Sequence, residues 1–232
     1  MMDGAEIIVY LTQDAVLAGA NAISLLLDAF TDPRIALAYG RQLPRRGATA
    51  IEAHARLHNY PANSSVRSFE DRERFGLKTI FISNSFAAYR RDALVSMGGF
   101  SPDVIFGEDT VMAGRLLMHG WKLAYVAEAA VYHSHDYSWT QEFKRYFDIG
   151  VLHSREPWML ENFGAASGLG QAFVISEIRY LWPRNLFFIP SAMIRTGLKL
   201  LGYRLGRQER KFGVRLKRSL SMHRGFWKAR QE

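Results

Sequence analysis

The expected fold is decided by the stretch Ile7–Leu11, IIVYL, and by the three residues TQD that follow it, the last of which is Asp14. A short, β-branched apolar run of this kind is typical of a buried strand in a parallel sheet. Apolar residues at helical spacing follow from Ala22 to Phe30, and an Asp-Pro pair ends that pattern before the next apolar run at residues 35–39. This order predicts a β-α-β unit with Asp14 at the carboxyl end of its first strand.

Apolar runs and helical patterns continue to alternate through residue 142. Thr49 and Glu52 have the spacing of a capping box, which predicts a helix from there to about His58. The other expected elements are a loop at residues 40–47, strands at 79–82, 122–126 and 130–133, and helices at about 91–97 and 108–119. Together they predict an α/β fold with a mostly parallel sheet and flanking helices.

The composition limits the possible chemistry. A chain of 232 residues, 48% of them hydrophobic, can bury a substantial core and has the size of one domain or of one domain with an appendage. It has no cysteine, which excludes disulfides, zinc-thiolate sites and thiol catalysis, so any nucleophile or ligand must be oxygen or nitrogen. The first residues show no charged leader before a long apolar run, so we expect neither a signal peptide nor an amino-terminal anchor, and a cytoplasmic body.

The carboxyl-terminal part has a different character. Residues 199–232 contain eleven Lys or Arg and two Glu, and the pattern from residue 143 onward is mostly helical, so we divide the chain into domains at 1–142 and 143–232. Residues 173–205 mix apolar and basic side chains, too interrupted to span a bilayer but suited to lie on an anionic membrane surface. We therefore expect peripheral association with the inner face of the cell membrane. A solvated basic face on packing helices is the alternative.

Two adjacent carboxylates and two imidazoles mark the candidate site. Glu108 and Asp109 lie just ahead of a predicted helix, and His133 and His135 lie just after a predicted strand. This combination suits acid/base chemistry beside a metal-bound phosphate, and residues two apart on an extended strand point to the same face. Each pair also has an ordinary interpretation, as charges that complement a helix dipole or as surface histidines.

The positions of the polar residues converge. Asp14, Asn84, Asp109 and His133 are all expected at edges of the predicted sheet, where open α/β sheets bind their ligands. A single Asp after a strand is more often a turn or capping residue than a ligand. The four positions together favour a functional site.

Six short segments carry a family resemblance. They are TQDA at residues 12–15, GRQLP at 40–44, NYP at 59–61, SNSFAAYR at 83–90, GED at 107–109 and YHSH at 132–135. In this order they resemble the rhamnosyltransferase-like branch of family-2 inverting glycosyltransferases, over about residues 5–160. The resemblance implies a GT-A, Rossmann-like domain that moves a sugar, with rhamnose as the candidate, from a nucleoside diphosphate to a glycan or lipid-linked acceptor. It also implies inversion at the sugar, a divalent cation and a role in cell-surface polysaccharide synthesis.

The resemblance also implies a role for each matching residue. Asp14 stands where such families carry an Asp-x-Asp motif, so one carboxylate of the pair is kept, and we expect it to bind Mg²⁺ or Mn²⁺ together with His133. Asp109 is the expected general base, and Glu108 is expected to orient it or the acceptor. The sequence does not separate His133 from His135 as the ligand. The other expected substrate-binding residues are Thr12, Gln13, Arg41, Gln42, Asn84 and His135.

The chain departs from the family pattern at its beginning. GT-A domains carry nucleoside-binding β-α-β units ahead of the metal motif, whereas Asp14 is almost the first feature here. We therefore expect the nucleotide-binding portion to be absent from this chain, and a partner chain to supply the missing strands. One alternative is that the chain is an inactive, truncated remnant or a membrane-associated binding subunit. The other is a metal-dependent hydrolase built on residues 133–136, although the usual His-x-His-x-Asp-His pattern of such enzymes is not met. We expect no nucleic-acid partner, since basic clusters are poorly specific.

Overall fold

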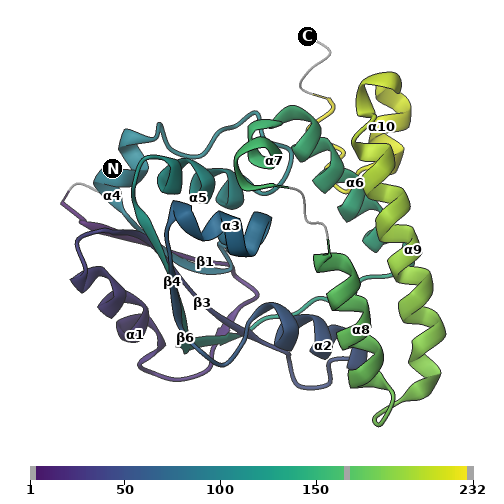
Figure 1. Cartoon of the computed structure of the whole chain (residues 1–232), viewed down its shortest axis with the longest axis horizontal. Coiled ribbons are helices and arrows are strands. Elements are labelled where there is room, and N and C mark those ends of the chain that lie inside the picture. The colour runs from purple at the N-terminus through teal and green to yellow at the C-terminus, as the bar shows by residue number, and fades with distance from the viewer. Residues whose placement is uncertain (1–3, 165–167, 229–232) are drawn as a thin grey trace.

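The computed structural model describes residues 4–164 and 168–228, and in it a curled sheet is covered by helices on both faces (Figure 1). The predicted α/β class is therefore confirmed. Residues 1–3 and 229–232 lie outside the described residues. The first range belongs to the predicted absence of a leader, and the second is the end of the basic segment. Within the described ranges, no helix is both long enough and apolar enough to cross a membrane.

The sheet found in the described residues has six strands, in the order β1-β5-β3-β6-β2, with β4 also paired to β6. Their bounds are β1 (Ile7–Leu11), β2 (Val16–Leu17), β3 (Ile35–Leu43), β4 (Ser65–Arg67), β5 (Phe86–Arg90) and β6 (Lys122–Tyr132). Only β3 and β6 pair in parallel among these strands, and the pairs β1–β5, β3–β5, β2–β6 and β4–β6 are antiparallel. The prediction of a mostly parallel sheet is wrong, because an apolar run does not encode the direction of its neighbour.

The strand that opens the chain differs most from its prediction. β1 lies at an edge of the sheet and pairs antiparallel with β5, with Val9 and Leu11 exposed. It is neither fully buried nor hydrogen-bonded to a parallel neighbour. Its direction nevertheless agrees with a β-α-β unit, since both β1 and β3 run antiparallel to β5, which lies between them.

Helices fill the space between and after the strands. They are α1 (Ala22–Asp28), α2 (Ala50–Asn59), α3 (Arg72–Phe75), α4 (Arg91–Ser96), α5 (Glu108–Met118), α6 (Trp139–Arg155), α7 (Trp158–Phe163), α8 (Leu169–Leu181), α9 (Ile189–Gly206) and α10 (Val214–Leu220). The predicted capping box is present, because the Thr49 side chain accepts the backbone N–H of Glu52 while the Glu52 carboxylate accepts that of Thr49. The predicted bounds of α2, α4 and α5 agree with the observed bounds within a residue or two, so these three predictions are confirmed.

Three local predictions are wrong. Residues 79 and 80 belong to a 3₁₀ helix, η3 (Gly76–Ile80), and the strand of this region is β5, so Asn84 precedes a strand instead of ending one. Residues 40–43 are part of β3 and not a loop, because they continue to pair with β6. The two strands expected at 122–126 and 130–133 are one strand with a bulge, since Gly40 pairs with Val126 and Arg41 with Ala130.

The bulge requires a glycine opposite it. A Cβ atom at Gly40 would lie 2.4 Å from the carbonyl oxygen of Ala129 and 2.3 Å from the Phe86 ring. Real Cβ atoms do not approach other atoms so closely, so only glycine lets β3 pass between β5 and the bulged part of β6. The bulge shifts the register of the last residues of β3 and β6, just before the candidate site.

Two cores lie on opposite faces of the sheet. The first core lies between α1 and the sheet, where Leu26 packs among small strand residues. The second core lies on the opposite face, where α5 and α7 pack against the sheet. Residues beyond position 142 belong to the second core, including Leu152, Met159 and Phe163. The division of the chain at 142 stays a prediction.

Candidate active site

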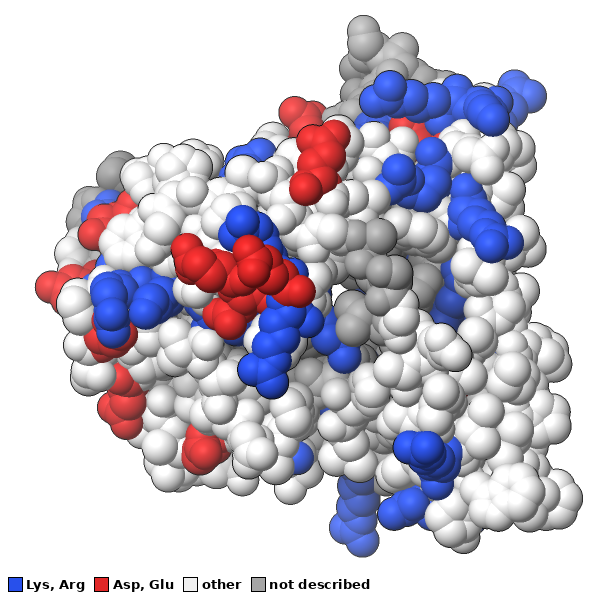
Figure 2. All heavy atoms as spheres, viewed as in Figure 1, with Lys and Arg blue, Asp and Glu red and all other residues white. Residues whose placement is uncertain are grey.

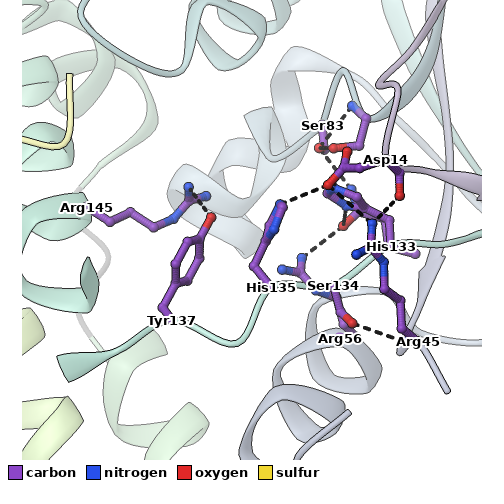
Figure 3. A network of polar contacts seen from close by, with 11 residues as sticks. Asp14, Arg45, Arg56, Ser83, His133, Ser134, His135, Tyr137 and Arg145 are labelled. Atoms are coloured by element: carbon purple, nitrogen blue, oxygen red, sulfur yellow. Dashed lines mark hydrogen bonds and ion pairs between the residues drawn. The ribbon is translucent and has the colours of Figure 1, made fainter. Parts of the chain in front are cut away.

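Three potential metal ligands meet where β1 and β6 end. Asp14 lies in the turn between β1 and β2, and the antiparallel pairing of Val16 with Tyr132 brings this turn beside His133 and His135. The Nε2 atom of His133 lies 3.4 Å from Oδ1 of Asp14, and that of His135 lies 4.0 Å from Oδ2 (Figure 3). One ligand atom from each residue lies within 4.8 Å of the others. The structure therefore brings together both histidines and the aspartate that the sequence predicted.

Gln42 fixes the orientation of the buried histidine. The Nδ1 atom of His133 is 3.1 Å from Oε1 of Gln42, which also accepts a hydrogen bond of 2.9 Å from Arg56, while Nε2 of Gln42 donates to Ser83. Since the Gln42 oxygen can only accept, Nδ1 of His133 carries the proton and its Nε2 lone pair faces Asp14. This is the tautomer that a metal ligand requires, held by an outer hydrogen bond.

The protonation states agree with a cation site. Burial, together with the nearby His135, lowers the pKa of His133 to about 4, so its ring is neutral at physiological pH. Burial alone would raise the pKa of Asp14, but the charges of the two histidines and local hydrogen bonds lower it below its ordinary value. A neutral imidazole beside an ionised carboxylate is a suitable pair of ligands.

Arginines surround the cluster. Nη2 of Arg45 lies 3.3 Å from Oδ2 of Asp14, and its backbone N–H donates to the Ser134 hydroxyl at 3.0 Å. On the other side the His135 ring contacts the Tyr137 ring at 5.3 Å between centroids, and the Arg145 guanidinium lies 5.5 Å from the Tyr137 ring (Figure 3). Guanidinium groups bind phosphate oxygens in a bidentate manner. The cluster therefore has a positive rim.

Asp109 occupies a different environment at the start of α5. Its Oδ2 accepts the backbone N–H of Asn84 at 3.1 Å, and its Oδ1 accepts that of Thr110 at 2.7 Å. Burial and then the neighbouring charge of Glu108 raise the pKa of Asp109 to about 6. A carboxylate with such a pKa is ionised at neutral pH yet basic enough to accept a proton, as a general base must be.

The turn ahead of β5 connects the two halves of the site. The Ser83 hydroxyl accepts from Gln42, which holds His133, and the next residue, Asn84, gives its N–H to Asp109. The Asn84 side chain is itself held by the Tyr89 hydroxyl at 2.7 Å. The His133 and Asp109 sides are therefore linked by consecutive residues of one short turn.

The other predicted site residues are placed less centrally. Arg41 donates through Nε to the carbonyl oxygen of Tyr60 at 3.2 Å, Thr12 gives its backbone N–H to the Ser85 carbonyl, and Gln13 is exposed. Glu108 lies in the first turn of α5 beside Asp109. The sequence reasoning missed Ser83, Arg45, Arg56, Tyr137 and Arg145. For Ser83 and Arg45 the signal was position, since Ser83 opens one of the quoted segments and Arg45 directly follows another.

The donor set fits a divalent cation. One carboxylate and two imidazole nitrogens are ligands that Mn²⁺ and related ions accept, and a set of three leaves positions for phosphate oxygens or water. Arg45, which pairs with the Asp14 carboxylate and also donates to the Asp14 backbone carbonyl, is exposed on the surface.

Comparison with known proteins identifies the family. The model of glycosyl transferase family group 2 matches residues 7–204. The chain is 46% identical over 223 residues to the O-antigen chain rhamnosyltransferase RfbN of Salmonella typhimurium, and 44% identical over 223 residues to the O-antigen chain rhamnosyltransferase WbaN of Salmonella anatum. Each match covers 96% of this chain and 71% of the relative.

A solved structure also matches. It is the mannosyltransferase PcManGT of Pyrobaculum calidifontis in complex with GDP-Man and Mn²⁺, with a TM-score of 0.48 and 14% identity. The match covers 97% of this chain and 60% of that chain. The family match over residues 7–204 and the two relatives decide the classification: this chain belongs to glycosyl transferase family group 2, as its motifs predicted.

Proposed function

We propose that this protein transfers a rhamnosyl group from a nucleoside diphosphate donor to a hydroxyl of a growing cell-surface glycan, with inversion. The observation that carries the proposal is the link from the Asp14–His133–His135 cluster through Ser83 and Asn84 to Asp109. The names of the two relatives support the choice of rhamnose and of O-antigen-type polysaccharide.

In the proposed reaction Asp109 takes the proton of the acceptor hydroxyl as its oxygen attacks C1 of the sugar. The bond between C1 and the diphosphate oxygen breaks on the opposite face, and the diphosphate leaves with the electron pair, which inverts C1. The raised pKa of Asp109 supports its role as the base, and Glu108, which contributes to that rise, tunes it.

The leaving diphosphate lies, in this proposal, over the three-ligand cluster. Asp14 and His133 would hold the divalent cation, Mg²⁺ or Mn²⁺, and His135 would complete the set or donate to a phosphate oxygen. When bound, the cation neutralises the developing charge of the diphosphate. Arg45 leaves Asp14 and binds a phosphate oxygen, which exchanges one anionic partner for another.

Five of the predicted substrate contacts complete this proposal. Gln42 acts by orienting His133, and Asn84 by holding Asp109 through its backbone N–H. Thr12 and Gln13 directly precede Asp14 after the end of β1, and we assign them to the donor side. We assign Arg41 to the acceptor side, at the end of β3, where it contacts the Tyr60 carbonyl.

We further propose that the enzyme works in the cytoplasm, at the inner face of the cell membrane, on a glycan or lipid-linked acceptor. Its basic carboxyl-terminal segment supports an anionic partner of this kind. The expectation that a partner chain supplies the missing strands stays a prediction.

Donor turnover tests the proposal. The full chain is incubated with nucleoside diphosphate derivatives of rhamnose, mannose and glucose, with Mn²⁺ or with a chelator, and release of the nucleoside diphosphate is measured. We expect release from the rhamnose donor when cation and acceptor are present, and little with the chelator. Equal release from all donors would contradict the proposed sugar, and full activity in the chelator would contradict the cation.

A further inference from the structure

The hairpin between α8 and α9 presents large apolar side chains to solvent. Phe187 is 86% exposed, Trp182 is 69% exposed, and Leu186 beside them is exposed as well. Met193 and Ile194, on the first turns of α9, are also exposed. Figure 1 shows this hairpin at a corner of the molecule, where the chain reverses direction away from the sheet. Single exposed apolar residues are ordinary, but a group of this size calls for a partner.

The exposed side chains stand on a packed base. Directly before the tip Leu181 is fully buried, and on α9 Ala192 is buried, both in a small core with Ile51 of α2. Tyr180 and Phe188 pack against the same core. The inward-facing residues of the hairpin are therefore satisfied within the molecule. The outward-facing aromatic residues are held in place, at a protruding turn and not in a groove.

The charges around the tip have one sign. Near the tip Arg179 and Arg184 are exposed, whereas Glu177, the acidic residue of α8, is buried. The guanidinium of Arg184 lies 4.2 Å from the Tyr180 ring, close to the tip. In Figure 2 the lower right part of the molecule shows blue basic side chains beside a large white surface and no red ones. The tip therefore favours an anionic partner.

We propose that the α8–α9 tip docks on an anionic bilayer, with Trp182, Leu186 and Phe187 inserted at the level of the headgroups. Tryptophan, phenylalanine and leucine next to arginine are the residues that bind membrane interfaces, because the apolar rings enter the acyl boundary while the guanidinium groups meet lipid phosphates. The protruding shape suits a soft, deformable surface better than a rigid protein partner, which would offer a complementary groove.

The tip is connected to the catalytic residues by the same helix. Trp139 donates from its indole nitrogen to the Ser191 hydroxyl of α9 at 3.2 Å, and Arg195 of α9 donates to the carbonyl oxygen of Tyr137. The segment that carries His135 is therefore fixed to the first turns of α9. A docked tip holds the candidate site near the lipid surface, where an acceptor attached to lipid is found; this last consequence rests on the proposed function.

Vesicle co-sedimentation of the full chain tests the inference. The vesicles are made of phosphatidylcholine alone, or of phosphatidylcholine with about one third phosphatidylglycerol, to supply negative charge. We expect binding to the anionic vesicles, and a loss of about tenfold or more in the double variant Trp182→Ser/Phe187→Ser, because both rings lose their insertion. Arg179→Gln/Arg184→Gln should reduce the preference for anionic over neutral vesicles by about tenfold.

Val95→Ser is the matched control, because Val95 is 64% exposed on α4, an element outside the hairpin, and its variant should bind vesicles as the unmodified chain does. Equal binding by the double variant, or an equal loss in the control, would overturn the inference. A double variant that changes its mass in solution but binds vesicles unchanged would also overturn the inference. That result would assign the tip to contact with a second copy of the chain. Donor titration without vesicles should be unchanged in the double variant, which separates this test from that of the proposed reaction.

Discussion

Asp14 and Asp109 are chemically identical side chains in one site, yet their surroundings give them opposite properties. Burial would raise the pKa of Asp14, which is partly exposed, but its interactions with His133 and His135 and local hydrogen bonds lower that pKa. Asp109 is enclosed beside Glu108, and its pKa is raised to about 6. The difference teaches that burial and neighbouring groups move the pKa values of two identical side chains in opposite directions, which supports the proposed division into one carboxylate for binding and one for proton transfer.

The largest expected effect comes from neutralising Asp109. Asp109→Asn should reduce transfer about a thousandfold, because the amide cannot accept the acceptor's proton, while donor affinity stays close to that of the unmodified chain. Asp14→Asn should instead weaken donor binding in the presence of Mn²⁺. The measurements are the turnover rate and donor titration by calorimetry. If both variants lost donor binding equally, the division between the two aspartates would be wrong.

A thermal unfolding experiment separates catalysis from folding in the same variant. Because the folded-state pKa of Asp109 is raised, the folded protein binds this proton more tightly than the unfolded chain, and stability is lost as pH rises through about 6. Asp109→Asn removes that ionisation but also one of the two oxygens that accept backbone N–H groups, so at pH 7.5 its midpoint should stay within a few degrees of that of the unmodified chain. A markedly lower midpoint would mean that the loss of activity reflects unfolding.

The next effect concerns the orientation of His133. Gln42→Met removes the acceptor for its Nδ1–H, and we expect Mn²⁺ affinity to fall about tenfold to a hundredfold, since the ring is no longer held in the ligand tautomer. Arg41→Met is the neighbouring control, because Arg41 contacts the Tyr60 carbonyl and not the cluster. Unchanged Mn²⁺ binding in Gln42→Met, measured by calorimetry, would show that Gln42 does not orient the ligand.

A pH profile sharpens the comparison. A general base works only when ionised, so turnover should fall as the pH drops through about 6, where Asp109 takes up its proton. Glu108→Gln removes a neighbouring charge that raises this pKa, so the acidic limb should move to lower pH and turnover below the original midpoint should rise about threefold. An acidic limb that does not move would assign the titration to another group.

The smallest effect is expected at Arg45. In Arg45→Gln the ion pair with Asp14 is lost, and since exposed pairs contribute little, Mn²⁺ affinity without donor should rise only about two- to threefold. Donor affinity with Mn²⁺ should fall by a similar factor, because a phosphate partner is removed. If Mn²⁺ affinity rises while donor affinity falls, Arg45 exchanges Asp14 for a phosphate group, as proposed. If both affinities change in the same direction, this exchange is contradicted.

Much of the fold and site was readable from the sequence, for local reasons. The capping box at Thr49 and the helical spacing from Glu108 to Met118 are set by residues a few positions apart, and both elements formed as predicted. The family motifs likewise drew attention to Asp14, His133 and Asp109, whose proposed roles stay predictions. The family membership itself was carried by these short segments.

Only the tertiary structure decided how those residues meet. The antiparallel partner of β1, the bulge that Gly40 permits and the turn that links Ser83 to Asn84 depend on contacts between residues far apart in the chain. The same is true of pKa values, because burial and neighbouring charge are properties of the packed molecule. Sequence determined which groups are present and which local elements form, and tertiary packing decided which aspartate is solvated and which is enclosed, since desolvation arises only after distant segments come together.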